Sequence, residues 1–461
     1  MSALGRGRAA APPFCEPLPF RPFFSIISSA FRMPSVSEIA QFEGKEITLK
    51  GWIYNFRSSG SIFFLQFRDG TGRAQIVISK SEVSAAAWEA CEKITIESSV
   101  LITGVVKKEP RAPSGFEVQG TSVTLIQRAE EFPISKKEHG PDFLMDNRHL
   151  WLRAARQTAI MKIRDEIEFS FREFFHQRGF VCADSPIFTA NAVEGTTDLF
   201  EVKYFDDVAY LSQSGQLYQE ATSAALGKTY CFGPTFRSEK SKTRRHLTEF
   251  WMLEAEASFM DWQENMQLQE ELVVYVVRRV LERRADDLKI LERDLTALQK
   301  TAEGNFPRLH YDEAVSQLTR LGSDIKSGDD FGGDDETILT KQFDRPIFIH
   351  HYPANIKAFY MKPDPEDSAR VLNNDLLAPE GYGEIIGGSE RIADLALLEQ
   401  RIKEHNLPPE AFKWYTDLRR YGSVPHSGFG IGLERTVAWI CGSEHVRETI
   451  PFPRMLNRLT P

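Results

Sequence analysis

The chain has 461 residues, 42% of them hydrophobic and 26% charged, with a formal net charge of −9. This composition is ordinary for a globular protein of two or three domains, and no apolar run reaches the roughly 20 residues that a membrane span needs. The five cysteines lie far apart without a CxxC pair, which disfavours a zinc knuckle or a disulfide scaffold and fits a reducing cytoplasm. Net acidity does not exclude nucleic acid, because basic residues can gather on one face. We expect no membrane partner.

Residues 1–32 stand apart in composition. They carry four arginines against a single acid, Glu16, and prolines interrupt them throughout. Scarce acids are typical of a transit peptide, whereas the prolines disfavour an amphipathic targeting helix. The segment is therefore a disordered tail, an organelle-targeting segment or an extension upstream of a start at Met33. We expect a cytoplasmic protein, or an organellar one if residues 1–32 are a transit peptide.

Residues 33–127 are predicted to form a small β-barrel. Alternating segments from Ile47 onward predict five strands, with turns at 58–60 and 69–72 and one helix at 81–94. Five strands and one helix in about 90 residues fit an oligonucleotide-binding (OB) barrel.

Barrels of this kind bind single strands by stacking bases on exposed aromatic rings beside basic residues. Arg57, Phe63 and Phe64 are the candidates for such a face. Adjacent strand residues point to opposite faces, which favours one exposed ring. The alternative is that both phenylalanines serve packing alone.

A hinge is predicted at residues 128–148, where charges of both signs accompany two prolines. The second domain, 149–461, opens with a predicted amphipathic helix over 150–180 that Gly179 closes. A predicted strand follows and ends at Pro186.

A basic loop between two predicted strands is the most informative stretch. The first strand ends in FRSE, from Phe236 to Glu239, and the second begins with HLTEF at His246. The loop carries the basic residues Lys240, Lys242, Arg244, Arg245 and His246. Charge that develops on phosphoryl oxygens needs preorganised donors, so this loop suits a polyphosphate. A solvated hairpin loop is the alternative.

A glycine-rich strand, GFGIG, precedes a predicted helix that starts with Glu434 and Arg435. Glycines at 428, 430 and 432 allow close backbone approach. We exclude a dinucleotide-binding fingerprint, because the sequence lacks both the GxGxxG spacing and a surrounding βαβ alternation.

Together these stretches resemble the class II aminoacyl-tRNA synthetases of the aspartyl/asparaginyl/lysyl subgroup, over nearly all of the chain after about residue 35. The helix and strand ending at Pro186 resemble motif 1, which builds the dimer interface in that class. FRSE, the basic loop and HLTEFWMLEAE resemble motif 2, and GFGIGLER resembles motif 3. The resemblance implies an α+β fold: an anticodon-binding OB barrel and a catalytic antiparallel sheet flanked by helices, in a homodimer.

The resemblance also implies roles around ATP at matching positions. Arg237 would grip the α-phosphate and the amino-acid carboxylate, and with Arg435 it is the expected catalytic pair. Phe250 and Arg435 would sandwich the adenine ring between an aromatic face and a guanidinium plane. The other expected ATP contacts are Glu239 to the adenosine, and Arg245 with His246 to the terminal phosphates.

Further positions are implied for metal, amino acid and tRNA. Glu384 matches a magnesium-ligating acid, so Mg2+ is the expected cofactor; the subgroup often has a serine three residues later, where this chain has Gly387, and the second metal contact stays open. Glu194 lies in a stretch that resembles a mobile substrate-covering loop and would hold the α-amino group, with Gln216 nearby. The expected anticodon contacts are Arg57, Phe64 and Gln75.

Aspartate and asparagine have nearly the same shape, so only charge and hydrogen bonding can separate them. Aspartyl members of the subgroup carry Gln-Ser-Pro-Gln, two further residues and a lysine that faces the substrate carboxylate; here that position is Gln219, followed by Glu220. Glu220 would accept from the amide of asparagine and repel aspartate, unless it is a structural carboxylate satisfied by the backbone or by Arg391. Arg391 would donate to the side-chain oxygen of either substrate. The stretch IKAFYMK has Lys357 and Ala358 where aspartyl members usually have Arg-Pro.

The expected activity is therefore asparagine–tRNA ligation: ATP activates L-asparagine to the aminoacyl-adenylate, and the acyl group passes to tRNA(Asn) with release of pyrophosphate and AMP. The substrate carboxylate is ionised at neutral pH, so activation needs no general base, and positioning with charge neutralisation supplies most of the acceleration. Aspartate–tRNA ligation and a paralogue making a non-tRNA product are the alternatives, although such a paralogue would be expected to lose the barrel. A nucleic-acid-binding protein with a dead catalytic domain is disfavoured by Arg237, Glu239, Arg391 and Arg435.

Overall fold

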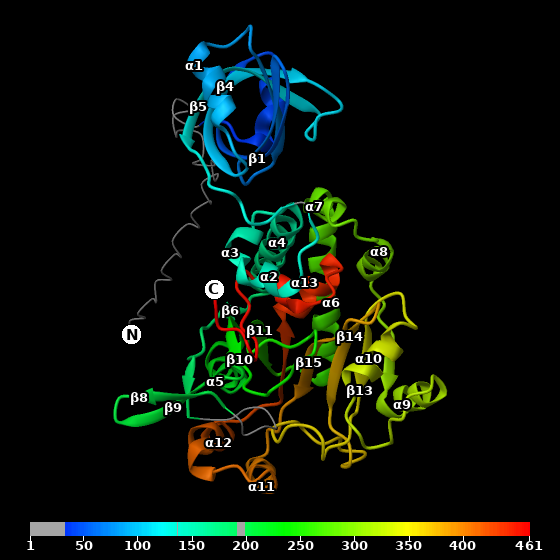
Figure 1. Ribbon diagram of the computed structural model, residues 1–461. Helices are drawn as coiled ribbons and strands as arrows, with labels where there is room; N and C mark the ends of the chain where they lie inside the picture. Colours follow the sequence, from blue (N-terminus) through cyan, green and yellow to red (C-terminus); the bar gives the residue numbers. More distant parts are fainter. Residues whose placement is uncertain (1–32, 136, 191–198) are drawn as a thin grey trace, which may run out of the picture. The chain divides into compact units, whose positions relative to one another are not determined.

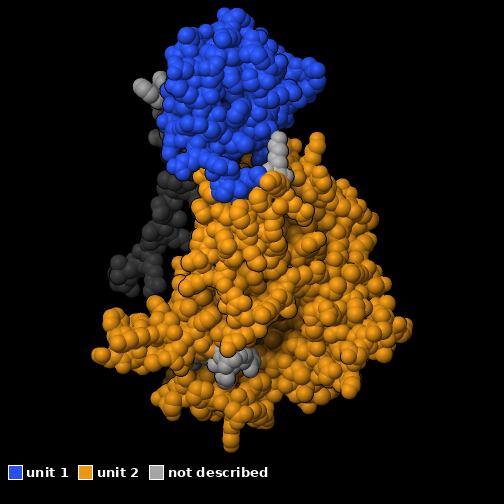
Figure 2. All heavy atoms as spheres, in the orientation of Figure 1, with its two compact units in different colours: residues 1–135 blue, residues 136–461 orange. Residues whose placement is uncertain are grey.

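The computed structural model describes residues 33–135, 137–190 and 199–461 of the chain. The chain divides into two compact units after Ser135, inside the segment predicted as a hinge (Figure 2). The interpretations of residues 1–32 concern a segment outside the described residues and stay predictions. In the described part of the chain, no helix is long and apolar enough to cross a membrane.

The first unit is a closed barrel (Figure 1). Its five strands follow the order β1-β2-β3-β5-β4, which confirms the predicted OB fold. Side chains alternate along each strand, and inward ones such as Leu65, Phe67 and Ile76 are fully buried. The predicted helix begins at a capping serine: Ser84 Oγ accepts from the backbone N–H of Ala87 at 3.2 Å. The elements are η2 (Val36–Phe42), β1 (Glu46–Ser59), β2 (Ile62–Arg68), β3 (Arg73–Ser79), α1 (Ala85–Lys93), β4 (Ser98–Lys108) and β5 (Phe116–Gln127).

The second unit is built on an eight-stranded sheet with the order β12-β13-β14-β15-β16-β11-β10-β6, antiparallel from β13 to β10. Helices pack against this sheet (Figure 1), which confirms the predicted α+β catalytic domain. Its first half comprises α2 (Pro141–Asp146), α3 (Arg148–Trp151), α4 (Ala155–Gln177), β6 (Val181–Cys182), β7 (Phe188–Thr189), β8 (Glu201–Tyr204), β9 (Asp207–Leu211), α5 (Gln216–Leu226), β10 (Lys228–Phe236), β11 (Glu249–Ser258), α6 (Trp262–Arg283), α7 (Ala285–Ile290) and α8 (Thr296–Glu303). The second half comprises β12 (Arg308–His310), α9 (Tyr311–Arg320), α10 (Gly333–Thr340), β13 (Ile347–His350), β14 (Asn373–Ala378), β15 (Gly383–Glu390), α11 (Leu395–Glu404), η3 (Pro409–Phe412), α12 (Lys413–Arg420), β16 (His426–Gly432), α13 (Leu433–Cys441) and η4 (Val446–Glu448).

The helix predicted over 150–180 is in fact split between α3 and α4. Ala154 adopts an extended backbone, with φ −65° and ψ 147°, and this interrupts the helix. α4 then buries Ile163, Phe171 and Phe175 in the main core, which it shares with α6 and the sheet. It ends before Gly179, whose φ of +75° suits glycine, as predicted.

Strand β11 lies between β10 and β16, so the motifs that carry the predicted ATP contacts meet in the middle of the sheet. A Cβ at Gly428 would lie 2.0 Å from Oε1 of Glu256, and one at Gly430 would lie 2.5 Å from Cε of Met252. A Cβ at Gly428 would also lie 2.4 Å from the carbonyl oxygen of Ala255, which confirms the predicted close backbone approach at this glycine, whereas nothing lies within 4 Å of a Cβ at Gly432.

His350, at the end of β13, lies among the rings of His310, His351 and Trp262, whose centroids are 5.7, 4.8 and 5.7 Å away. Burial lowers the pKa of His350 to about 4, and the charges of His351 and His310 add to this. Above the unfolded-state pKa of about 6.5, the imidazole is neutral in both the folded and the unfolded chain, so its lowered pKa does not change the free energy of unfolding. Below that value the unfolded chain gains the proton first, so stability falls as pH drops towards 4.

We therefore expect acidification to destabilise the second unit through His350. After discounting for its partial exposure, the loss at this site is about 1 kcal/mol at pH 5. The His350→Asn variant has no imidazole to protonate, so its unfolding free energy should fall less between pH 7 and pH 5. Urea unfolding of both proteins at both pH values measures the difference, and equal losses in the two would contradict the expectation.

Candidate active site

A cavity of about 740 Å3 opens in the second unit, with walls from β11, β14, β15 and β16, from the loops after β10 and β13, and from the first turns of α5 and α13. It is lined by all the predicted ATP contacts: Arg237, Glu239, Arg245, His246, Phe250, Glu384 and Arg435. The predicted amino-acid contacts Gln216 and Arg391 line it as well. Glu220 is not in the lining, and Glu194 lies outside the described residues.

Of the two arginines predicted to be catalytic, Arg237 belongs to the motif 2 stretch and Arg435 to the motif 3 stretch. Arg237 directly follows β10; its Nη1 donates to the carbonyl oxygen of Gln213 at 2.7 Å, and its guanidinium lies 5.6 Å from the Phe250 ring centroid. Arg435, in the first turn of α13, donates from Nη1 to the carbonyl oxygen and to Oε2 of Glu384, at 3.0 and 3.1 Å. Guanidinium forks placed in this way can bind phosphate oxygens or stack on a planar base.

Arg245 and His246 lie together on the motif 2 side of the cavity. Arg245 forms an ion pair with Glu336 of α10 at 2.8 Å. Burial lowers the pKa of Arg245 and that of His246, which favours a neutral imidazole with one N–H donor. Nε2 of His246 and Oε2 of Glu239 are buried without a hydrogen-bond partner among the described residues. Buried polar atoms ordinarily have partners, and a nucleotide in the cavity would supply them.

An acidic corner surrounds Glu384. Lys357 Nζ donates to Asp375 and to Asp330, each at 3.1 Å. Burial, with the charge of Glu384 nearby, raises the pKa of Asp375 to about 6 and that of Glu336 to about 7. This corner holds more negative charge than its cations neutralise, which a divalent cation would relieve.

Asp375 is a candidate metal ligand that the sequence pattern did not single out. Pairing of β14 with β15 sets Asp375 opposite Gly387. A Cβ at Gly387 would lie 3.2 Å from Oε1 of Glu384 and 3.7 Å from Oδ1 of Asp375, so two carboxylates flank the position where a serine was expected. Among the residues that the structure describes, no group of three or more His, Cys, Asp or Glu could hold a metal ion. Two carboxylates completed by water and phosphate oxygens are a usual arrangement for Mg2+.

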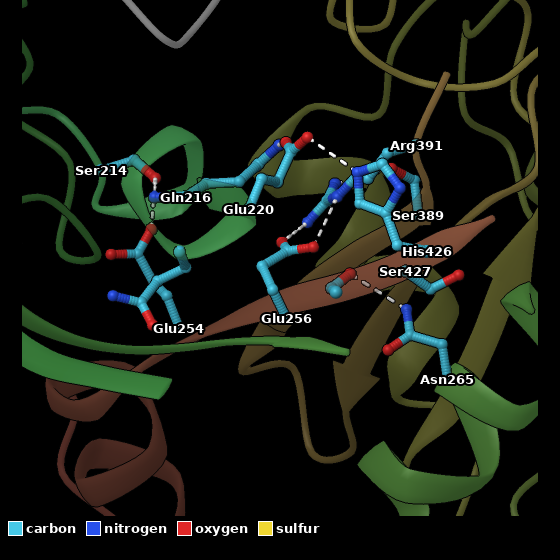
Figure 3. Close-up of polar contacts among 12 residues, drawn as sticks. Ser214, Gln216, Glu220, Glu254, Glu256, Asn265, Ser389, Arg391, His426 and Ser427 are labelled. Carbon is cyan, nitrogen blue, oxygen red and sulfur yellow. Dashed lines mark hydrogen bonds and ion pairs between the residues drawn. The ribbon is translucent and has the colours of Figure 1, made fainter. Parts of the chain in front are cut away.

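Arg391, directly after β15, lines the cavity and is almost fully buried. Its Nε and Nη2 donate to the Glu256 carboxylate, and its Nη1 donates to Ser389 Oγ at 2.7 Å (Figure 3). Burial alone would lower the pKa of Arg391, but the Glu256 carboxylate raises it above its usual range. Arg391 is therefore a fixed cation, with N–H groups left for a ligand in the cavity.

Glu220 belongs to a buried cluster behind the cavity wall. Its carboxylate accepts from Gln216 Nε2 at 3.1 Å, Tyr415 Oη at 2.8 Å, Arg419 Nη2 at 2.6 Å and His426 Nε2 at 2.9 Å. A carboxylate has about four lone-pair sites, so a direct bond from a substrate amide would have to displace one of these donors. The cation paired with Glu220 is Arg419, not Arg391 as the structural alternative supposed.

Gln219, at the position of the aspartyl lysine, is fully buried and turned away from a substrate role. Its Nε2 donates to the carbonyl oxygen of Ala183 at 2.6 Å and to Ser185 Oγ at 3.0 Å. No side-chain cation stands at this position to meet a substrate carboxylate.

The barrel in the first unit carries the predicted anticodon contacts on neighbouring strands. Phe63 is buried in the barrel core, whereas Phe64 is half-buried on the outer face, as the strand alternation predicts. The Arg57 guanidinium lies 4.3 Å from the Phe64 ring centroid. Gln75, on β3, donates from Nε2 to Glu117 of β5 at 3.0 Å.

Two family models match the chain. The model described as tRNA synthetases class II (D, K and N) matches residues 140–456, and the OB-fold nucleic acid binding domain matches residues 47–126. The first of these alone covers more than half of the chain. The protein belongs to the class II tRNA synthetases of the D, K and N group.

Within that group, the chain falls among the asparagine–tRNA ligases. It is 58% identical to the "Asparagine--tRNA ligase" of Pelotomaculum thermopropionicum over 426 residues, which are 92% of this chain and 99% of the relative. It is 56% identical to the same enzyme of Thermus thermophilus over 434 residues, 92% of this chain and 99% of the relative. Asparaginyl-tRNA synthetase from Pyrococcus horikoshii, solved with asparaginyl-adenylate, superposes with a TM-score of 0.90 at 47% identity, covering 94% of this chain and all of that one.

Proposed function

We propose that this protein activates L-asparagine with ATP and transfers the asparaginyl group to tRNA(Asn), releasing pyrophosphate and AMP. The observation that carries the proposal is the composition of one cavity, which joins the motif 2 and motif 3 arginines to Arg391 and Gln216. Relatives named "Asparagine--tRNA ligase" over nearly the whole chain support it. A structural neighbour that holds asparaginyl-adenylate supports the same substrate.

The side chains suggest how the first step is promoted. The ionised carboxylate of asparagine attacks the α-phosphorus in line, so no general base is needed. Arg237 neutralises charge on the α-phosphate, while Phe250 and Arg435 hold the adenine ring. Glu239 and His246 supply their unpartnered buried atoms to the nucleotide. In the second step the acyl group passes to a hydroxyl of the terminal ribose of the tRNA.

Glu384 and Asp375 would hold Mg2+, which neutralises phosphate charge when bound. The fit rests on the two carboxylates that flank Gly387 and on the raised pKa of Asp375. Glu194 stays a proposed contact to the α-amino group.

The Asp375→Asn variant should need a higher Mg2+ concentration for half-maximal ATP–pyrophosphate exchange, by about tenfold, because it removes one of two carboxylate ligands. A Mg2+ titration of exchange measures the shift. Asp330→Asn is the matched control, since Asp330 also accepts from Lys357 at 3.1 Å but does not flank Gly387. Equal shifts in the two variants would assign the effect to Lys357.

The test of the proposed function is ATP–pyrophosphate exchange with asparagine and aspartate side by side, followed by charging of tRNA(Asn). Exchange with asparagine alone, together with charging, is the expected result. Exchange with aspartate would make the protein an aspartate–tRNA ligase with an unusual pocket. Exchange without charging would favour a paralogue with a non-tRNA product.

We also propose a homodimer through the motif 1 region. The edge strand β6 leaves Val181 44% exposed, and α4 leaves Phe169 52% exposed. Exposed apolar side chains of this size beside an open sheet edge are typical of an interface.

Phe169→Asp should shift the protein from dimer to monomer in analytical ultracentrifugation, because the new carboxylate would be buried without a partner. Leu321→Asp, at an exposed leucine after α9, is the control and should leave the dimer intact. A monomeric wild type, or a dimeric Phe169→Asp variant, would contradict this interface.

A further inference from the structure

We propose that Tyr415, Arg419 and His426 are positioning residues for recognition of the substrate's amide group: they fix Glu220, and Glu220 fixes Gln216 with its amide oxygen towards the cavity. The proposal rests on the proposed function and names the groups that set its amino-acid selectivity. None of the three was singled out by the sequence.

The three residues reach Glu220 from two elements far from it in the chain. Tyr415 and Arg419 lie four residues apart on α12, hence on one face of that helix. Tyr415 Oη donates to both carboxylate oxygens, at 2.8 and 2.9 Å. Arg419 Nη2 bonds Glu220 at 2.6 Å, and its Nε is tied to the carbonyl oxygen of Ile392 at 2.8 Å. The guanidinium is thus held from both sides.

His426, at the start of β16, completes the cluster. Its Nδ1 lies 2.8 Å from the carbonyl oxygen of Val424, and its Nε2 lies 2.9 Å from Oε2 of Glu220 (Figure 3). Nη2 of Arg419 also lies 3.5 Å from Nε2 of His426, so the imidazole contacts both members of the Glu220–Arg419 ion pair. Burial would raise the pKa of Glu220, but Arg419, His426 and Arg391 together lower it below its usual range, so the carboxylate is ionised.

Charge in this cluster does not reject aspartate. Glu220 contributes one negative charge and Arg419 contributes one positive charge, while Arg391 is paired with Glu256. The repulsion of aspartate by Glu220 that the sequence suggested is therefore offset within the cluster. Discrimination has to come from the direction of hydrogen bonds.

The direction is set at Gln216, on the same face of α5 as Glu220. An ionised carboxylate forces Gln216 to turn its NH2 group towards Glu220, and Nε2 donates to Oε1 at 3.1 Å. The amide oxygen of Gln216 is left for the cavity that this residue lines, while Arg391 offers donors to the same cavity. A primary amide has a donor and an acceptor, so it can pair with both the Gln216 oxygen and the Arg391 N–H groups. A substrate carboxylate has only acceptor oxygens, and one of them would face the Gln216 oxygen without a hydrogen bond. If Glu220 were not held in this position, the side-chain amide of Gln216 could flip and present its NH2 group to the cavity instead.

The Tyr415→Phe variant tests this in the full-length protein. It removes the hydroxyl that bridges both oxygens of Glu220 and keeps the ring that packs against Phe359 and Trp414. In ATP–pyrophosphate exchange, the KM for asparagine should rise about tenfold and the asparagine-to-aspartate ratio of kcat/KM should fall by about the same factor. The KM for ATP should not change.

Tyr275→Phe is the matched control, because Tyr275 Oη also donates to a carboxylate, Glu173, at 2.7 Å but lies outside the cavity lining. It should leave both KM values and the ratio unchanged. Should Tyr415→Phe fail to fold, Arg419→Lys keeps the charge but loses the fork, and should give the same selective change.

An unchanged ratio in a folded Tyr415→Phe or Arg419→Lys variant, or parallel losses in kcat and in the KM for both substrates, would overturn the proposal and leave these residues a structural role. Failure of the proposed function itself would show differently, as a wild-type protein without asparagine-dependent exchange.

Discussion

Replacing Arg237 with alanine is expected to lower asparagine-dependent ATP–pyrophosphate exchange by about a thousandfold, with most of the loss in kcat. Activation develops charge on the oxygens of the α-phosphate, and a fixed cation binds that charge more strongly in the transition state than in the ground state. Arg237 is suited to this because it follows β10 directly, lines the cavity and is held by the Gln213 carbonyl at 2.7 Å.

The loss should be far larger than the effect on folding. Arg320→Ala is the control: Arg320 lies on α9, is exposed, and donates to the carbonyl oxygen of Ser316 in its own helix. Its exchange rate should equal that of the wild type. Arg237→Lys should recover only part of the rate, because an ammonium lacks the planar fork that binds two oxygens at once. Retention of a tenth or more of the wild-type kcat in Arg237→Ala, an order-of-magnitude threshold, would remove Arg237 from the catalytic step.

The ATP half of the site could be predicted because its residues come in short consecutive runs. FRSE begins at the last residue of one strand, and HLTEF leads into the next strand. These two strands pair directly, so residues that are close in the sequence are also close in the sheet. The barrel was predictable for a similar reason, since alternation and turn residues are local signals.

Asp375 and the surroundings of Glu220 could not be predicted in this way. Asp375 matters because β14 sets it opposite Gly387, and strand register is not visible in one sequence. Glu220 meets Arg419 almost 200 residues later, through a helix whose own pattern indicates only an amphipathic surface. A carboxylate within a motif marks a candidate site, but the residues that it contacts depend on long-range packing.

Replacing Phe64 with alanine should lower kcat/KM for tRNA charging by about ten- to a hundredfold, since stacking on one base contributes about 1–3 kcal/mol. Exchange without tRNA should be unchanged, because the cavity that supports it lies wholly in the second unit. Phe64 is suited to stacking because its ring lies on the outer face of β2 with the Arg57 guanidinium 4.3 Å away.

Two further variants separate stacking from a general loss of surface. Phe64→Trp keeps an aromatic face and should retain most of the charging activity, whereas Ile126→Ala removes an apolar side chain that is 62% exposed on β5 and should have no effect. Equal charging by Phe64→Ala and the wild type would take Phe64 out of tRNA binding. A parallel fall in exchange would mean that the substitution acts on the fold, because a base-stacking residue affects only the step that uses tRNA.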